Sequence, residues 1–131
     1  MSGEKDLVKL IRDLQPKLNT GNYVFVSVSN LDVINRKITL FEFKEAEGVT
    51  VVMEQYMADE LQLEYHYVAS WITLMVNSSL DAVGLTAIFS KALADHQISC
   101  NVVAGYYHDH IFVDIKDTNI AMEVLMQLSK Q

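Results

Sequence analysis

The order of the apolar patterns in the second half of the chain restricts the fold more than any other feature. Apolar residues alternate along residues 71–77, which predicts a strand with one buried face. They then recur at helical spacing through residues 85–93, which predicts an amphipathic helix. Two more extended segments, 98–105 and 110–115, precede a last helix that begins after Asp117. This order of strand, helix, strand, strand and helix is typical of α+β folds with antiparallel sheets.

The first half contains similar elements in a different order. Residues 7–14 carry an apolar helical stripe, and Pro16 is expected to end that helix because proline lacks the N–H group that helical hydrogen bonding needs. Alternation predicts a strand at residues 23–28, and residues 38–54 are predicted to form a hairpin. A short helix is predicted at residues 55–61. The first half is therefore also of the α+β type, but it begins with a helix.

Neither half holds the six elements of a ferredoxin-like β-α-β-β-α-β fold in the usual order. The second half lacks the final strand, and the first half starts one element too early. We therefore expect an α+β, ferredoxin-like architecture made of two interlocked halves, residues 1–66 and 67–131. Helices or strands of each half are expected to complete the fold of the other. Helices are expected to cover one face of each antiparallel sheet. The predicted core of the second half consists of Ile72, Leu74, Val76, Leu85, Phe89, Leu93, Val113, Val124 and Leu125.

Composition excludes several classes of protein. Half of the residues are hydrophobic, which is enough for a buried core, but no apolar run reaches the roughly 18 residues of a membrane span. Seventeen acidic against ten basic residues give a net charge of −7, and Arg36-Lys37 is the only adjacent basic pair. Nucleic acids and anionic membranes are therefore unexpected partners. The single cysteine excludes an internal disulfide, and the first residues show no signal peptide, so we expect a cytoplasmic protein.

A short motif connects the predicted strand at 71–77 to the helix that follows it. Asp81-Ala82-Val83-Gly84-Leu85 opens the helix, and Gln97-Ile98 begins the next strand. In this arrangement the segment from Trp71 to Val113 resembles the ACT domain, a small ligand-sensing module attached to enzymes of amino-acid metabolism. Many ACT domains have proline where Val83 stands. The resemblance implies a ferredoxin-like fold and an amino acid or similar metabolite as the ligand.

The resemblance extends to most of the chain. Residues 99–110, SCNVVAGYYHDH, are similar to a string found in small stand-alone bacterial proteins that contain tandem ACT domains and have no assigned effector. The segments YVFVSV, ITLFEF and EGVTVVME resemble the degenerate N-terminal repeat of those proteins. The chain is therefore expected to be a tandem of two ACT-like halves.

The turn from Asn77 to Leu85 is the best candidate for a ligand site. A strand-to-helix turn presents N–H groups and the positive end of a helix dipole, which together suit a carboxylate. The structural alternative is ordinary capping of the helix by Ser79 or Asp81, with Gly84 needed only for packing. Asn101, at the start of the next strand, is either a ligand contact or a structural hydrogen-bonding residue. The candidate ligand-binding residues are Asn77, Ser78, Ser79, Asp81, Val83, Gly84, Leu85 and Asn101.

Other polar or reactive residues are weaker candidates. His108-Asp109-His110 resembles a metal-binding pattern, but a zinc site needs three or four ligands and no neighbouring cluster supplies them. These residues could instead belong to a turn or contact an effector. Tyr106-Tyr107 either pack at an interface or stack on a ligand, and Cys100 is expected to be a buried, inert thiol. No catalytic motif is present, and we expect no cofactor and no metal.

These observations predict a small-molecule sensor rather than an enzyme. The effector is expected to be an amino acid, and its binding would bias how halves or protomers pack. The alternative is a structural or protein-interaction module that keeps the fold without a ligand. A homodimer is expected, and an unidentified downstream protein could receive the signal.

Overall fold

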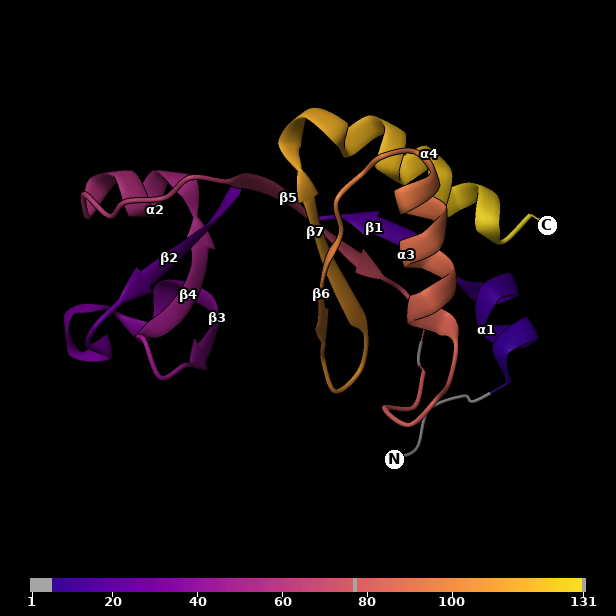
Figure 1. The fold of residues 1–131 in the computed structure, drawn as a ribbon, viewed down its shortest axis with the longest axis horizontal. Coiled ribbons are helices and arrows are strands. Elements are labelled where there is room, and N and C mark those ends of the chain that lie inside the picture. Colours follow the sequence, from indigo (N-terminus) through magenta and orange to yellow (C-terminus); the bar gives the residue numbers. More distant parts are fainter. Residues whose placement is uncertain (1–5, 77, 131) are drawn as a thin grey trace. The chain divides into compact units, whose positions relative to one another are not determined.

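The computed structural model describes residues 6–76 and 78–130, and its chain divides into two compact units (Figure 1). The larger unit consists of Met1–Thr20 together with Ser70–Gln131, and the smaller unit consists of Gly21–Ala69. The first twenty residues therefore belong to the same unit as the second half of the chain. None of the helices in the described part of the chain is long and apolar enough to cross a membrane.

The larger unit is a four-stranded sheet with helices on one face (Figure 1). Its strands lie in the order β1-β5-β7-β6. Strand β1 is antiparallel to β5, and β6 is antiparallel to β7. Its elements are α1 (Leu7–Asp13), β1 (Pro16–Leu18), β5 (Val68–Leu74), α3 (Leu85–Asp95), β6 (Asn101–Ala104), β7 (Asp109–Asp114), the 3-10 helix η3 (Ile115–Asp117) and α4 (Thr118–Leu128).

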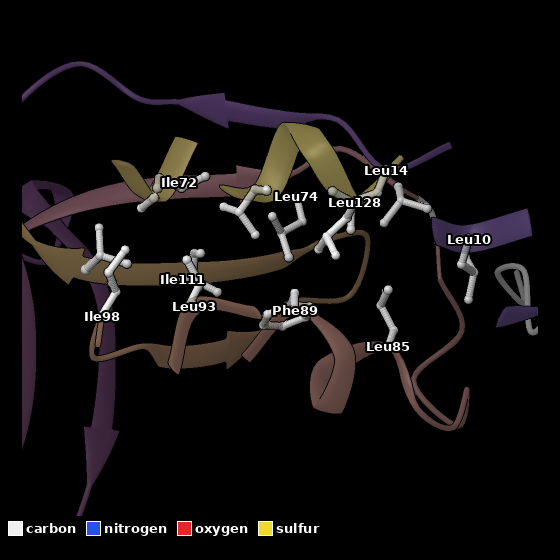
Figure 2. Packing of buried hydrophobic residues seen from close by; sticks show 14 residues of the cluster. Leu10, Leu14, Ile72, Leu74, Leu85, Phe89, Leu93, Ile98, Ile111 and Leu128 are labelled. Carbon is white, nitrogen blue, oxygen red and sulfur yellow. The ribbon is translucent and has the colours of Figure 1, made fainter. Parts of the chain in front are cut away.

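The core of the larger unit lies between the sheet and its helices (Figure 2). Alternate residues of β5 and β7 point toward the helices, and α3 contributes Leu85, Phe89 and Leu93 from successive turns. These residues are almost completely buried, and such burial contributes about 1.5–3 kcal/mol for each large apolar side chain. The core consists of Leu10, Leu14, Ile72, Leu74, Val76, Leu85, Phe89, Leu93, Ile98, Ile111, Val113, Ala121, Leu125 and Leu128.

The smaller unit is built around a three-stranded antiparallel arrangement, β3-β4-β2, which is extended by the first residues of β5. Its inner face carries Val24, Val26, Val51 and Met53, and these pack with Ala58 of the short helix α2. Its elements are β2 (Tyr23–Val28), the 3-10 helices η1 (Leu31–Val33) and η2 (Arg36–Ile38), β3 (Thr39–Lys44), β4 (Val49–Glu54) and α2 (Gln55–Glu60).

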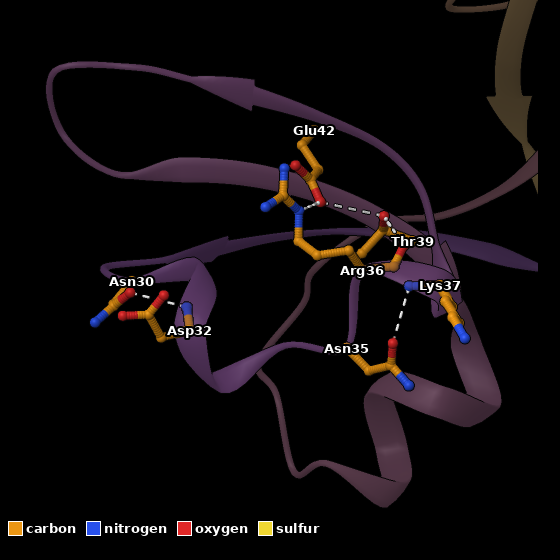
Figure 3. A network of polar contacts seen from close by, with 7 residues as sticks. All are labelled: Asn30, Asp32, Asn35, Arg36, Lys37, Thr39 and Glu42. Carbon is orange, nitrogen blue, oxygen red and sulfur yellow. Dashed lines mark hydrogen bonds and ion pairs between the residues drawn. The ribbon is translucent and has the colours of Figure 1, made fainter.

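Local polar contacts hold the connection between β2 and β3 (Figure 3). The side chains of Asn30 and Asn35 accept hydrogen bonds from the backbone N–H groups two residues later, which caps η1 and η2. Arg36 Nε donates to Glu42 Oε2 at 2.5 Å, and this contact lowers the pKa of the Glu42 carboxyl. These local hydrogen bonds act together with Ile34, which is buried in the core of the smaller unit, to order the segment.

The predicted fold class is confirmed, and most predicted elements are present within a few residues. Of the nine predicted core residues, eight are buried, and Val124 is partly buried against the same cluster. The sequence pattern missed β1 and the three 3-10 helices. Strand β1 is only three residues long and begins with Pro16, so it has no periodicity to detect. The boundaries of the two halves at residues 66 and 67 remain a prediction.

Truncating Phe89 tests the core of the larger unit. Phe89 has no exposed surface, so we expect Phe89→Ala to lower the free energy of unfolding by about 3–5 kcal/mol. The same exchange at Phe43, which is 67% exposed, should cost less than about 1 kcal/mol. Urea denaturation followed by circular dichroism measures both values. Equal losses at the two positions would contradict the packing described.

Candidate functional site

A cavity of about 150 Å³ lies at the turn that the sequence predicts as a ligand site. One wall is the segment that precedes α3 and the first turn of that helix. The opposite wall is formed by the end of β6, the following turn and the start of β7. The lining residues are Ser78, Ser79, Leu80, Ala82, Gly84, Leu85, Thr86, Ala104, Gly105 and Asp109.

Gly84 determines how α3 begins. Its φ of +103° lies in the left-handed region, which side chains other than glycine rarely adopt. A β-carbon on Gly84 would lie 3.0 Å from Leu7 Cδ2, so helix α1 makes the close approach that the glycine permits. The first helical bond runs from the Ile88 N–H to the Gly84 carbonyl at 3.1 Å. Three N–H groups of α3 therefore precede this bond at the cavity, and Gly84 has no side chain that could accept from them.

The predicted capping of α3 by Ser79 or Asp81 is wrong. The residue that caps α3 is Gly84, and Ser79 instead donates its hydroxyl hydrogen to the Asp81 carboxylate. Three residues separate Asp81 from the first residue of the helix. The side chains of Ser79 and Asp81 therefore hydrogen-bond to each other within the turn and do not cap the helix. Asp81 is exposed and does not line the cavity, whereas Ser79 does.

Asp109 supplies a carboxylate to the cavity. It begins β7 opposite Ala104, and the alternation of the strand places it on the same face as the core residues Ile111 and Val113. Burial raises the pKa of the Asp109 carboxyl, and the nearby His110 and His108 oppose this shift. A partly buried carboxylate thus faces the same space as the positive end of α3.

The structure brings together some of the predicted site residues and separates others. Ser78, Ser79, Gly84 and Leu85 line the cavity. Val83 is 84% exposed and is not among the lining residues. Asn101 pairs with Phe112 on the face of the sheet opposite the helices, so it lies away from the cavity. Asn77 lies outside the described residues.

The sequence did not indicate Thr86 as a site residue, and it included Asp109 only in the His108-Asp109-His110 pattern, for which an effector contact was one of several alternatives. The signal for Asp109 was present, because an acidic residue stands in phase with the apolar residues of a strand. In the described ranges 6–76 and 78–130, no three His, Cys, Asp or Glu side chains lie together in a way that could hold a metal ion. Burial raises the pKa of the Cys100 thiol to about 11, so it stays protonated at neutral pH.

A wider groove of about 420 Å³ lies between α3 and α4, but its chemistry differs. Asp95 and Glu123 line it together with His96, and the C-terminal end of α3 adds negative potential there. Such a groove disfavours a carboxylate ligand. The smaller cavity differs, because it combines the positive end of α3 with the single carboxylate of Asp109.

Comparison with known proteins agrees with this architecture. An ACT-domain family model matches residues 2–70, and a second ACT-domain model matches residues 67–127. The chain belongs to the ACT-domain family. No curated protein matches the sequence.

Solved structures contain the same fold. A Vibrio cholerae protein of unknown function, described as a possible transport protein, is 41% identical with a TM-score of 0.86, and the match covers 95% of this chain and 97% of that one. The regulatory subunit of aspartate kinase from Thermus thermophilus is 7% identical, with a TM-score of 0.59 and coverage of 86% and 95%. Aspartokinase III from E. coli, in complex with aspartate and ADP, is 14% identical, with a TM-score of 0.64 and coverage of 93% and 34%. At these low identities the two kinase matches show the ACT fold alone.

The raised pKa of Asp109 predicts how its substitution changes stability. In the folded protein this pKa lies above its ordinary value of 3.8, so the carboxyl favours folding only while it is protonated. That contribution is present below pH 3.8 and is lost as the pH rises through the folded-state pKa. At pH 7 the ionised group is destabilising, and we expect Asp109→Asn to raise the melting temperature measured by calorimetry.

Asp114→Asn is the matched control for this prediction. Asp114 stands at the other end of β7 and accepts a hydrogen bond from the Lys116 N–H, which asparagine can also accept. We expect this control to change stability by no more than about 0.5 kcal/mol. A lower melting temperature for Asp109→Asn at pH 7 would show that the carboxylate stabilises the apo fold.

Proposed function

We propose that this ACT-domain protein is a non-catalytic regulatory module that binds a small free amino acid in the cavity at the start of α3. The observation that carries the proposal is the pairing, within one cavity, of a helix N-terminus with the carboxylate of Asp109. A free amino acid carries the two complementary charges. The membership in the ACT-domain family and the similarity to kinase regulatory domains support a regulatory role.

The cavity has the size for a small ligand. Its volume of about 150 Å³ lies below the roughly 300–1,000 Å³ of pockets for drug-sized molecules. An engineered protein cavity of about 150 Å³ holds a molecule of benzene. An amino acid with a short side chain is therefore a better fit than an aromatic amino acid, which adds a ring to the charged backbone groups.

Each charged group of the ligand has a partner. The ligand carboxylate would accept hydrogen bonds from the N–H groups of the first turn of α3, where the helix dipole favours an anion. The ligand ammonium would donate to the carboxylate of Asp109 on the opposite wall. The hydroxyls of Ser78 and Thr86, which also line the cavity, can complete the polar contacts.

Ligand binding would act by joining two elements that are distant in sequence. The ligand would connect the start of α3 to the start of β7, which favours one arrangement of these walls over others. An effector shifts such an equilibrium by its difference in affinity for the two states, typically about 1–3 kcal/mol. We infer that a cytoplasmic partner protein reads this change, which is the output that a non-catalytic regulatory module of the ACT-domain family would need.

A thermal-shift screen against the twenty amino acids tests the proposal. A ligand at about 100 times its dissociation constant should stabilise the protein by about 2.7 kcal/mol, which raises the melting temperature by several degrees. Calorimetry with the best ligand should then show at least a tenfold loss of affinity for Asp109→Asn. A hydrogen bond to a charged group contributes about 1.5–3 kcal/mol, which corresponds to this loss or more.

The control variant again is Asp114→Asn, which should bind within about twofold of wild type because Asp114 does not line the cavity. Gly84 is unsuitable for this test, since its left-handed φ and its contact with Leu7 make substitutions change the fold. If no amino acid raises the melting temperature, the protein is better explained as an interaction module without a ligand. If a ligand binds Asp109→Asn and wild type equally, it binds elsewhere.

We also propose that the protein forms a homodimer. Strand β6 ends the sheet of the larger unit, and its residue Val102 is 37% exposed, so the strand edge offers unpaired backbone groups to a second copy. Light scattering at tens of micromolar should report twice the chain mass of 14.8 kDa. Val102→Glu should shift this value toward the monomer, whereas Val33→Glu, at an exposed valine that is not part of strand β6, should not. A monomeric wild type would refute the dimer.

A further inference from the structure

The face of the sheet opposite the helices carries a polar cluster that the proposed function does not use. Trp71 and Thr73 of β5 lie next to His110 of β7, and Asn19 reaches them from the residue after β1. The Trp71 indole Nε1 donates to His110 Nδ1 at 3.1 Å, and Thr73 Oγ1 lies 3.1 Å from the same nitrogen. The side chain of Asn19 donates to Thr73 Oγ1 at 2.9 Å and to the Trp71 carbonyl at 3.2 Å.

This geometry specifies the protonation state of His110. An indole N–H is only a donor, so His110 Nδ1 must carry a lone pair and the ring proton must be on Nε2. The Thr73 hydroxyl accepts from Asn19 and can direct its own hydrogen to the same lone pair. An imidazolium carries hydrogens on both nitrogens. Protonation of His110 would therefore place a hydrogen on Nδ1 opposite the Trp71 N–H and remove the acceptor from the indole, whereas the Thr73 hydroxyl oxygen could turn from donor to acceptor.

The other edge of the imidazole is in contact with a wall of the cavity. A β-carbon on Gly105 would lie 3.1 Å from His110 Nε2 and 3.2 Å from its Cδ2, so the ring packs directly on the backbone of this glycine. Gly105 lines the cavity, as does Asp109, the residue before His110. The Gly105 N–H also donates to the His108 carbonyl at 2.9 Å, which closes the turn.

The charged groups around His110 come from several elements. His108 and Asp109 flank it in sequence, and Asp114 shares its face at the end of β7. Strand β1 contributes Lys17, which pairs with Thr73. The neighbouring residues of β5 and β6 are uncharged. Burial lowers the pKa of His110, His108 lowers it further, and Asp109 opposes the shift.

We propose that His110 is a proton-operated switch, whose protonation breaks the hydrogen bond from Trp71, reverses the one with Thr73 and moves the β6–β7 turn at the wall of the cavity. The folded state favours the neutral ring, so the contact with Trp71 is complete above pH 6.5, the ordinary imidazole pKa. It is lost as the pH falls through the lower pKa of the folded protein. The switch does not require a ligand, and it stands independently of the proposed function.

Tryptophan fluorescence tests this switch directly, because Trp71 is the only tryptophan in the chain. Titration of the wild-type protein from pH 8 to pH 4.5 should show one change in Trp71 emission with a midpoint below pH 6.5. His110→Asn should abolish this transition. His108→Gln should keep it and move the midpoint upward, since a second positive charge is removed. His96→Gln, at an exposed histidine on the helical face, should leave the midpoint unchanged.

Nuclear magnetic resonance of the unmodified protein provides a second test that does not depend on the folding of variants. At pH 8 the His110 ring should be the Nε2–H tautomer, and the amide signals of Gly105 and Asp109 should shift with the same midpoint as the Trp71 emission. An Nδ1–H tautomer overturns the proposal. So does a fluorescence transition that persists in His110→Asn, a midpoint at or above pH 6.5, or a Gly105 signal that does not respond.

Discussion

Strand β5 is the element on which both the core and the polar face of the larger unit depend. Alternation along a strand sends successive side chains to opposite faces, so Ile72 and Leu74 enter the apolar core while Trp71 and Thr73 face the other way. A shift of one residue in register would exchange the two sets and place polar groups in the core. The pairing of β5 with β1 and its position beside β7 maintain this register.

The cavity follows from the way α3 must start. The approach of Leu7 leaves no room for a side chain at Gly84, and the left-handed backbone there turns the chain sharply into the helix. Because glycine has no side chain, the first N–H groups of α3 receive no hydrogen bond from the side chain of the residue that caps the helix. On the opposite wall, Asp109 keeps a carboxylate at a position whose burial raises its pKa. Groups that cost stability and share a cavity are typical of binding sites.

The fold of this protein is shared with other proteins, but the chemistry of its cavity depends on its own side chains. The ACT fold recurs in regulatory domains of aspartate kinases at 7% identity, so sequences that share few residues can form the same layers. Such a likeness does not identify the ligand, because binding depends on the particular side chains placed on the fold. In this chain Asp109 and the hydroxyls of Ser78 and Thr86 determine the chemistry of the cavity. The cluster around His110 lies on the face of the sheet opposite the helices. Protonation of His110 is proposed to move the β6–β7 turn, which forms part of the cavity wall.

By itself the sequence determined the elements and most of the core of this protein, because strand alternation and helical stripes are local patterns. The residues of α3 and β7 that point inward could be identified from spacing alone, and so could the turn before Gly84. The tertiary structure decided which residues meet there. It placed α1 and β1 with residues 70–131, brought Leu7 against Gly84, and set Asp109 across from the start of α3. It also joined Trp71 to His110. These partners are tens of residues apart, and only the packing of the sheet against its helices brings them together.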